Sequence, residues 1–237
     1  MNKKNLLFLD TETTGNDLEK DRLCQVCYKI GDKIETKNFK PEIPISTKAM
    51  SITHITNKMV ENEESFADSQ FKKALEILLK ENVLVAHNAK FDIAMLNSDG
   101  VEVKQHICTL RLARHLDEQQ EIPEYNLQFL RYYYEVEIEA NPHSAEGDVL
   151  VLEAIFKYLY RQMEEVLKTK DESKIIKEMI EVSARPSLIR KFNFGKHQGR
   201  LLSEIVAEDR GYLEWLLAQK EKDEDEDWIY TLRHYLG

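Results

Sequence analysis

The chain has 237 residues, which is long enough for one large domain or for a domain with a small appendage. Its 33 basic and 43 acidic side chains give a formal net charge of −10, which excludes a polycation that coats nucleic acid along its whole length. Hydrophobic residues make up 42% of the sequence, enough to build a packed core, which excludes an intrinsically disordered chain. Any nucleic-acid partner must therefore be bound by a local basic patch or through cations.

The cysteine count and the apolar stretches indicate the compartment. Three cysteines, an odd number in a chain of this length, favour a reducing environment over a disulfide framework. Cys24 and Cys27 have the spacing of half a zinc site, but no second Cys/His pair matches it, so we expect two core cysteines. No stretch approaches the roughly 20 apolar residues that span a bilayer. We therefore expect a cytoplasmic protein that does not contact membranes.

Hydrophobic spacing predicts strands in the first part of the chain and helices after them. Leu6–Leu9 is a short apolar run of the kind found in buried strands, and Gly31-Asp32 between two apolar segments indicates a hairpin. Apolar residues at helical spacing follow, interrupted by a second buried strand at Val83–Ala86. The expected strands are 6–9, 23–30, 33–39 and 83–86, and the expected helices are 65–80, 91–96, 110–116, 126–134 and 144–168. This order predicts an α/β fold with a mixed sheet flanked by helices.

The last third of the chain is predicted to form a separate unit. A charged stretch at 168–173 is typical of a connector, and a helix over 173–183 should end before Pro186. Beyond it, the pattern of 191–202 predicts a hairpin, and two or three short helices should follow. The expected division is residues 1–168 as a first domain, 169–188 as a connector and 189–237 as a small C-terminal domain.

Four carboxylates and one histidine are the candidate catalytic residues. Asp10 and Glu12 stand two residues apart at the end of the first strand, so their side chains should project from one face. Two carboxylates that close repel each other unless a divalent cation holds them. Each element has an ordinary explanation when taken alone: an Asp-x-Glu pair is common at surfaces, Asp92 suits a helix start, and His143 suits a loop before the helix of Asp148.

Taken together, these segments resemble the DEDD superfamily of 3′–5′ exonucleases. The motifs that carry the resemblance are Asp10-Thr11-Glu12-Thr13-Thr14-Gly15, then His87-Asn88-Ala89-Lys90-Phe91-Asp92, then His143 with four residues before Asp148. The last spacing is that of the DEDDh branch. The segment 45–56, followed by Met59-Val60, resembles the substrate-side loop of the same branch. The segments 185–188, 192–196 and 211–216 resemble the C-terminal region of its exodeoxyribonuclease X subfamily, so the resemblance covers nearly the whole chain.

The resemblance implies a ribonuclease-H-like core and a metal-dependent 3′–5′ exodeoxyribonuclease that acts in DNA repair or recombination. Two divalent cations, Mg²⁺ or Mn²⁺ because all the ligands are oxygens, would be held by four carboxylates: Asp10, Glu12, Asp92 and Asp148. His143 would take a proton from the attacking water, and a reference pKa of about 6.5 suits that role near neutral pH. The products would be nucleoside 5′-monophosphates.

Five residues in or near these motifs are candidates for contact with the substrate. Thr13 and Thr14 have backbone N–H groups that can reach the terminal nucleotide. His54 and Asn88 have side chains that can hydrogen-bond the 3′ end. Phe91 is suited to stack on a base, although a core position on its own helix explains it equally well. Such contacts work with any base, so single-stranded ends suit the site.

A basic segment near the C-terminus provides positive charge that the acidic first domain lacks. Residues 185–200 contain five basic side chains, two phenylalanines and no acidic side chain. Arg190, Lys191 and Lys196 are the candidate nucleic-acid contacts, because basic residues next to aromatic ones are typical of such surfaces. A solvated hairpin whose phenylalanines pack inward explains the same pattern.

Three other functions agree with the same residues. A proofreading subunit of a DNA polymerase would share the catalytic positions but should carry a polymerase-binding tail, whereas 185–215 resembles the exodeoxyribonuclease X subfamily. An RNA 3′–5′ exonuclease of the same branch is also open, because no residue visibly reads a 2′-OH. A catalytically silent nucleic-acid-binding module is disfavoured by five intact catalytic positions. The expected partner is a DNA 3′ end, single-stranded or duplex, and the oligomeric state is left open, with a homodimer as one candidate.

Overall fold

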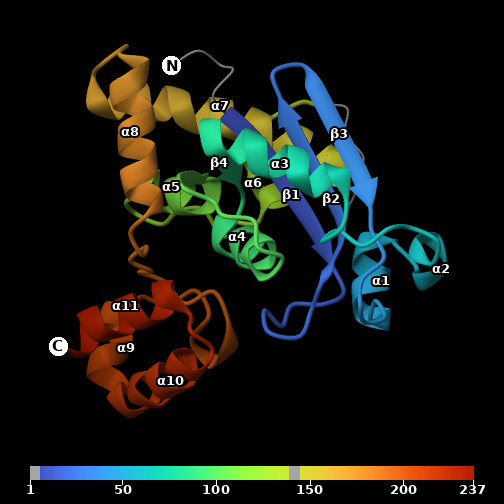
Figure 1. Ribbon diagram of the computed structural model, residues 1–237. Coiled ribbons are helices and arrows are strands. Elements are labelled where there is room, and N and C mark those ends of the chain that lie inside the picture. The colour runs from blue at the N-terminus through green and yellow to red at the C-terminus, as the bar shows by residue number, and fades with distance from the viewer. Residues whose placement is uncertain (1–5, 139–144) are drawn as a thin grey trace.

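The computed structural model describes residues 6–138 and 145–237, and five strands within them form one mixed sheet. The strands are β1 (Leu6–Thr13), β2 (Leu23–Ile30), β3 (Lys33–Asn38), β4 (Val83–Ala86) and β5 (His106–Cys108). Their order across the sheet is β3-β2-β1-β4-β5. β2 pairs antiparallel with both β1 and β3, whereas β1, β4 and β5 run parallel (Figure 1). The mixed sheet predicted from the sequence is confirmed.

Eight helices are described in this α/β core, by which we mean residues 6–183. They are α1 (Thr47–Thr53), α2 (Asn57–Val60), α3 (Gln70–Glu81), α4 (Ala89–Ser98), α5 (Thr109–Leu116), α6 (Leu127–Tyr133), α7 (Ala145–Leu167) and α8 (Glu172–Ser183). The predicted helix over 65–80 begins later than expected, because Ser69 caps α3 by accepting a hydrogen bond from the Lys72 N–H at 3.0 Å. No helix in the described ranges is both long and apolar enough to cross a bilayer.

The alternation of side chains along β1 builds a core on each face of the sheet. Leu7 and Leu9 are buried in a cluster with residues of α3 and α4. Leu6 and Phe8 point the other way, into a cluster with the long helix α7, where the Phe8 ring packs edge-on against Phe156 at 5.4 Å. The next two residues that face α7 are therefore the ones at positions 10 and 12.

β1 is longer than the sequence predicts, and its extension carries the acidic motif. The antiparallel ladder with β2 continues through Asp10 and Glu12, with a bulge between Glu12 and Thr13. The parallel ladder with β4 stops at Phe8 and Val85, after which the chain of β4 turns into α4. The acidic half of β1 thus lies beside the turn between β4 and α4, at the edge where ligands usually bind to α/β sheets.

Cys24 and Cys27 lie on opposite faces of β2, as expected for residues three apart in a strand. Each is fully buried, and each belongs to a different apolar cluster. Their thiols are free, as is the thiol of Cys108. The structure therefore agrees with the prediction of core cysteines.

The C-terminal bundle, residues 189–237, has a core of its own. Three helices surround this core: α9 (Leu202–Glu208), α10 (Arg210–Lys222) and α11 (Glu226–Leu236). The hairpin predicted at 191–202 is reduced to a single antiparallel bridge between Lys191 and Leu201. A 3-10 turn at Gly195–His197 replaces the expected strands, because the buried His197 ring turns inward and contacts Asp209 at 3.0 Å. The separate core supports the proposed domain boundary near residue 189.

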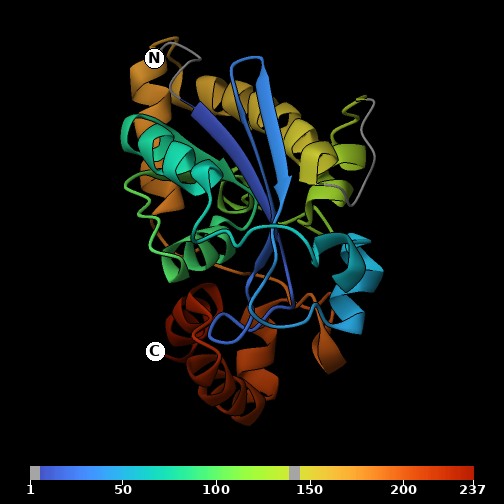
Figure 2. The same cartoon turned by 45° about the vertical axis from the view of Figure 1, so that its right-hand side comes forward.

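The C-terminal bundle sits below the end of the sheet toward which the β1 arrow points (Figures 1 and 2). Its contact with the α/β core is polar. Asp227 of α11 pairs with Arg111 at 3.0 Å and with Arg114 at 2.7 Å, and both arginines come from α5. Gln120 receives a hydrogen bond from the Lys191 ammonium on its carbonyl at 2.8 Å and gives one to the Leu188 carbonyl at 2.7 Å.

Candidate active site

Three carboxylates from two elements meet on the α7 face of the sheet. Asp10 and Glu12 project from β1 on that face, and Asp148 stands in the first turn of α7, which packs over it. One carboxylate oxygen from each residue lies within 4.8 Å of the others. The structure therefore brings together three of the four carboxylates selected from the sequence, although 135 residues lie between Glu12 and Asp148.

The fourth carboxylate, Asp92 of α4, does not lie within 4.8 Å of all three, but it lies beside β1 next to them. Its side chain is 4% exposed and accepts a hydrogen bond from the Thr11 hydroxyl at 2.8 Å. Thr11 stands between Asp10 and Glu12 in β1, so its side chain points to the opposite face, where α4 lies. The charge of Asp92 raises the pKa of both Asp10 and Glu12. We call the four residues the carboxylate cluster.

The carboxylate cluster is strongly charged and poorly solvated. Burial, followed by the charges of Asp92, Glu12 and Asp148, raises the pKa of Asp10 well above its usual range. Burial and the charges of Asp148 and Asp92 raise the pKa of Glu12 to about 7. Burial also raises the pKa of Asp92 to about 7, and the Thr11 hydrogen bond opposes that rise. Positive charge in their midst would favour the charged state of these groups near neutral pH.

Oxygen ligands at this spacing fit hard divalent cations. A carboxylate-only set suits Mg²⁺ or Mn²⁺ and is a poor set for zinc, which prefers nitrogen and sulfur. Gln128 of α6 orients the cluster by donating from Nε2 to Oδ1 of Asp148 at 2.6 Å. Its Oε1 is buried and has no hydrogen-bond partner in the described part of the chain, so the site has unused polar capacity. The residues present therefore fit a divalent metal site.

Two residues that hydrogen-bond the cluster carboxylates, Thr11 and Gln128, were not selected as site residues from the sequence. Thr11 belongs to the acidic motif, and its position between two acids on a strand is a usable signal that its hydroxyl faces the other way. Gln128 lies 20 residues before Asp148 on another helix, and no sequence pattern marks it. Hydrogen bonds of this kind hold metal ligands in place, and their loss costs about 10- to 100-fold in metal affinity or activity.

The predicted general base, His143, lies outside the described residues, so its role remains a prediction. The neighbouring motif histidine, His87, is unsuited to that role. Its Nε2 donates to the carbonyl of Tyr125 at 2.8 Å, which leaves Nδ1 to accept from the Thr109 hydroxyl at 2.9 Å. Burial lowers the pKa of His87 to about 4, so the ring is neutral and holds the turn after β4.

Two known protein families match this chain in sequence. Residues 7–156 match the family described as Exonuclease, and residues 192–221 match the family described as Exodeoxyribonuclease X-like C-terminal. The first match spans more than half of the chain. The chain belongs to the exonuclease family.

Individual relatives agree with the family. Exodeoxyribonuclease 10 of Escherichia coli (strain K12) is 28% identical over 239 residues, covering 98% of both chains. The PolC-type DNA polymerase III of Caldanaerobacter subterraneus is 32% identical over 167 residues, but the match covers 66% of this chain and 12% of that protein. A solved structure of exonuclease X with 5′-overhanging duplex DNA has a TM-score of 0.58 at 23% identity and covers 75% of this chain and 99% of its own.

These findings confirm three predictions. The solved exonucleases share the ribonuclease-H-like α/β fold, which is the fold class expected from the sequence. The chain is an enzyme of the nuclease class and binds nucleic acid. The exonuclease family is metal-dependent, and the carboxylate cluster provides ligands of the kind that it needs.

In this exonuclease, Thr13 and Thr14 hold the turn between β1 and β2. The Thr13 hydroxyl donates to the Gly15 carbonyl at 2.5 Å, and the Thr14 hydroxyl donates to Asp21 at 2.6 Å. The Thr14 N–H already donates to the Arg22 carbonyl at 3.0 Å. Contact between these threonines and a terminal nucleotide remains a prediction.

His54 and Asn88 share an unusual backbone conformation. Both have left-handed dihedrals, with φ of 59° and 58°, and both side chains are exposed. Asn88 precedes α4 but makes no capping hydrogen bond, so its side chain is available to a ligand. Phe91 is half-buried against the core and also lines a cavity, so the structure agrees with both explanations of this residue.

The predicted basic contacts all have partners within the protein. Arg190 donates to the Glu118 carbonyl, and Lys191 donates to the Gln120 carbonyl at 2.8 Å, so both join the C-terminal bundle to the α/β core. Lys196 pairs with Asp209 at 2.6 Å, and its side chain is 58% exposed. A role for these three residues in nucleic-acid binding remains a prediction.

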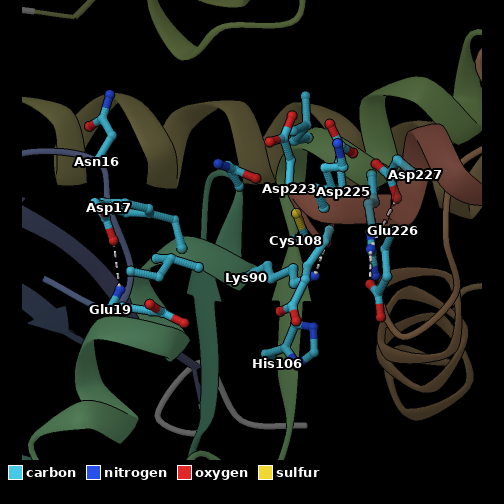
Figure 3. Close-up of a pocket in the computed structure, with 17 residues that line it drawn as sticks. Asn16, Asp17, Glu19, Lys90, His106, Cys108, Asp223, Asp225, Glu226 and Asp227 are labelled. Carbon is cyan, nitrogen blue, oxygen red and sulfur yellow. Dashed lines mark hydrogen bonds and ion pairs between the residues drawn. The ribbon is translucent and has the colours of Figure 1, made fainter. Parts of the chain in front are cut away.

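An acidic cavity of about 930 Å³ lies between the α/β core and the C-terminal bundle (Figure 3). Asp17 and Glu19 stand on one side, and the run from Asp223 to Asp227 at the start of α11 stands on the other. Lys90 crosses to this run and donates to the Glu224 carbonyl at 3.0 Å. The carboxylate cluster does not line this cavity, and the surplus of acidic groups is unfavourable for a DNA backbone.

Proposed function

We propose that this exonuclease removes nucleotides from the 3′ end of DNA, releases nucleoside 5′-monophosphates, and acts in DNA repair or recombination. The observation that carries the proposal is the meeting of Asp10, Glu12 and Asp148 on one face of the sheet, with Asp92 close enough to raise the pKa of Asp10 and of Glu12. The match to Exodeoxyribonuclease 10 over 98% of both chains supports the choice of DNA. It also supports the participation of the C-terminal bundle in the same activity.

The carboxylate cluster would hold two divalent cations, Mg²⁺ or Mn²⁺. When bound, the cations supply Lewis-acid activation of the scissile phosphate and of water. Thr11 and Gln128 fix the orientation of Asp92 and Asp148 through the hydrogen bonds described above. Before cations bind, the clustered negative charge repels a phosphodiester, so substrate and metal binding are coupled.

His143 would accept the proton of the attacking water. It lies five residues before Asp148 in the sequence, and an imidazole with an ordinary pKa of about 6.5 works near neutral pH. The neutral, fully hydrogen-bonded His87 leaves His143 as the candidate base of the three motifs.

We propose contacts of the 3′-terminal nucleotides with the five motif residues Thr13, Thr14, His54, Asn88 and Phe91. The exposed, unbonded side chain of Asn88 supports this most directly. Arg190, Lys191 and Lys196 are proposed to contact the strand farther from its end. Of the three, Lys196 is the best test residue, because it does not join the C-terminal bundle to the α/β core.

The alternatives have less support. The PolC-type polymerase of Caldanaerobacter subterraneus and the polymerase III epsilon subunit of Treponema pallidum match 66% and 62% of this chain, whereas the Escherichia coli exodeoxyribonuclease matches 98% of both chains. A silent binding module has no reason to gather four mutually repelling carboxylates, three of them half-buried and one buried. The digestion experiment described next distinguishes an RNA substrate from a DNA substrate. We further propose the cytoplasm as the compartment, supported by three free, buried cysteines, and a homodimer as a state to test by light scattering.

The decisive experiment is digestion of matched DNA and RNA oligonucleotides that carry a 5′ label, with Mg²⁺, with Mn²⁺ and with excess chelator. The proposal predicts a ladder shortened from the 3′ end for DNA, activity with either cation, and none with chelator. Blocking the 3′ end should stop the reaction, and blocking the 5′ end should not. Full activity in chelator, or faster loss of RNA than of DNA, would contradict it.

A further inference from the structure

A second cavity, of about 740 Å³, lies between the α/β core and the C-terminal bundle and has an unusual lining. His87, Asn88 and Tyr125 line it from the α/β core. Asn193 and Gln198 line it from the C-terminal bundle, together with the Trp228 ring. Asn88 also lines the acidic cavity, so the two spaces meet at the turn between β4 and α4.

Asn126 lines this second cavity, but its amide already accepts from the Phe129 N–H and donates to Glu124, each at 2.8 Å. Three further carboxamide side chains converge on the cavity, which we call the amide cavity. They belong to Asn88, Asn193 and Gln198, and all three are exposed. Across residues 6–138 and 145–237, none of the three side chains has a hydrogen-bond partner. A carboxamide offers an acceptor oxygen next to a donor NH₂, which matches the edge of a nucleobase. Three unused amides at one cavity indicate a polar, uncharged ligand.

Two aromatic residues give the lining flat and rigid surfaces. Trp228 is 6% exposed and packs on Phe192 and Phe194, with ring centroids 5.2 Å apart in each pair. Tyr125 is fixed at both ends, because its hydroxyl donates to Asp117 at 2.7 Å and its carbonyl accepts from His87 at 2.8 Å. Fixed aromatic surface beside convergent polar groups is a usual feature of a ligand site.

The charges at the amide cavity favour a neutral ligand over a phosphate. Arg114 lines it, but its guanidinium is paired with Asp227 at 2.7 Å. Asp225 is paired with Lys220 at 3.0 Å, and Glu124 adds a further negative charge at the rim. With the cation already paired and acidic groups around it, a phosphodiester is repelled, whereas an uncharged base is not.

We propose that the amide cavity binds an unpaired nucleobase of the DNA strand whose 3′ end occupies the carboxylate cluster. This inference rests on the proposed function. Asn88 links the amide cavity to the carboxylate cluster, because it lines the cavity and stands directly before α4, the helix that carries Asp92. The sugar-phosphate backbone stays outside, and Asn193 and Gln198 contact the base edge. The C-terminal bundle is then part of the substrate site, and a base must leave its duplex to enter, so unpaired ends are preferred.

The test is the binding of single-stranded DNA that carries one abasic residue. The probe is a fluorescein-labelled oligonucleotide with phosphorothioate linkages at its 3′ end, and the abasic position is moved stepwise away from that end. For the wild-type protein, fluorescence anisotropy should show one position where the missing base weakens binding by about fivefold. The Asn193→Ala/Gln198→Ala double variant should bind the intact strand about fivefold more weakly and lose this position dependence.

Gln119→Ala is the matched control, because Gln119 is an exposed carboxamide that lines neither cavity. It should behave like the wild type in the same series. An unchanged position dependence in the double variant, or none in the wild type, would overturn the proposal. An effect that appears only when the abasic residue is in the complementary strand of a duplex would also overturn it.

The test separates this inference from the proposed function. If the double variant loses the position dependence but the wild type fails to shorten DNA with Mg²⁺, the base site stands and the proposed function falls. If the wild type shortens DNA from the 3′ end and shows no position dependence, the reverse holds.

Discussion

Charged side chains are arranged differently in two regions of the molecule. The carboxylate cluster gathers acidic groups, whereas the contact between the α/β core and the C-terminal bundle pairs acidic with basic groups. In the cluster, all the neighbouring charges that shift Asp10 and Glu12 are acidic, and they raise the pKa of both. In the contact, Arg111 and Arg114 face Asp227, and Arg111 lowers the pKa of Glu226. The contact is balanced within the protein, whereas the cluster is balanced only when cations bind.

The difference indicates which region contributes to folding stability and which contributes to activity. The α/β core is apolar on both faces of the sheet, and its packing tolerates a buried patch of like charge. Such stored repulsion is common at functional sites, where a ligand relieves it. Changes in the cluster should therefore alter activity far more than folding, and changes in the contact should do the reverse.

The largest effect is expected for Asp92→Asn. The substitution keeps the shape of the side chain and removes one ligand charge, so turnover should fall by about 10³-fold or more, since several kcal/mol of transition-state stabilisation are lost. Initial rates on 5′-labelled DNA check this. Asp99→Asn, an acid at the other end of α4, is the control and should retain the wild-type rate. Less than a tenfold loss for Asp92→Asn would contradict the assignment.

His143→Ala should reduce turnover by roughly 10²- to 10⁴-fold while leaving metal affinity largely intact, because a general base acts on water rather than on the cations. Turnover and Mn²⁺ affinity are measured on the same preparation. His115→Ala, on the exposed end of α5, is a matched control. Undiminished turnover would remove His143 from the mechanism.

Thr11→Val and Gln128→Ala should each lower activity by about tenfold, because each removes a hydrogen bond that orients a cluster carboxylate. The readout is the Mg²⁺ concentration for half-maximal rate, which should rise in both variants and fall back toward normal for Thr11→Ser. A loss of rate with no change in Mg²⁺ dependence would indicate a purely structural role.

Glu12→Gln should stabilise the metal-free protein at pH 8 by about 2 kcal/mol. The pKa of Glu12 is raised from 4.5 to about 7 in the folded protein, so its stabilising effect is complete below 4.5 and is lost as the pH rises through 7. The gain should therefore shrink at pH 5. Melting temperatures in chelator check this, and Mg²⁺ should stabilise the wild type more than the variant. A Glu12→Gln variant that is less stable at both pH values would contradict the account.

The smallest effect is expected at the contact. Asp227→Asn weakens two ion pairs with partly buried partners and should destabilise the docking of the C-terminal bundle by about 1 kcal/mol. Faster cleavage between residues 184 and 188 in limited proteolysis is the expected sign. Glu226→Gln, whose side chain is 54% exposed, should change the cleavage rate little. Equal cleavage rates for Asp227→Asn and the wild type would show that the ion pairs of Asp227 do not stabilise the docking of the C-terminal bundle.

Local patterns in the sequence predict most of the regular structure. The paired segments around Gly31 became β2 and β3, and the long amphipathic stretch became α7. The end of β1 was misplaced because Asp10–Thr13 is polar, and its pairing with β2, which a local pattern does not contain, keeps it extended. The hairpin at 191–202 failed for a similar reason, since burial of His197 turns the segment inward.

The candidate site divides in the same way. Asp10, Glu12 and Asp148 were selectable because their spacing matches known motifs, and the structure brings them together. Gln128 was not selectable, because its position depends on how α6 packs beside α7. The amide cavity exists only after the C-terminal bundle docks, so no pattern around Asn193 reveals it.

The most direct measurement of the central claim is the number of Mn²⁺ ions bound, counted by titration followed with electron paramagnetic resonance. The wild-type protein should bind two ions. Asp10→Asn removes the carboxylate whose pKa is raised by the charges of all three others, so this variant should lose at least one ion while keeping the same fold. Two ions bound with unchanged affinity by Asp10→Asn would show that these carboxylates do not hold the metal.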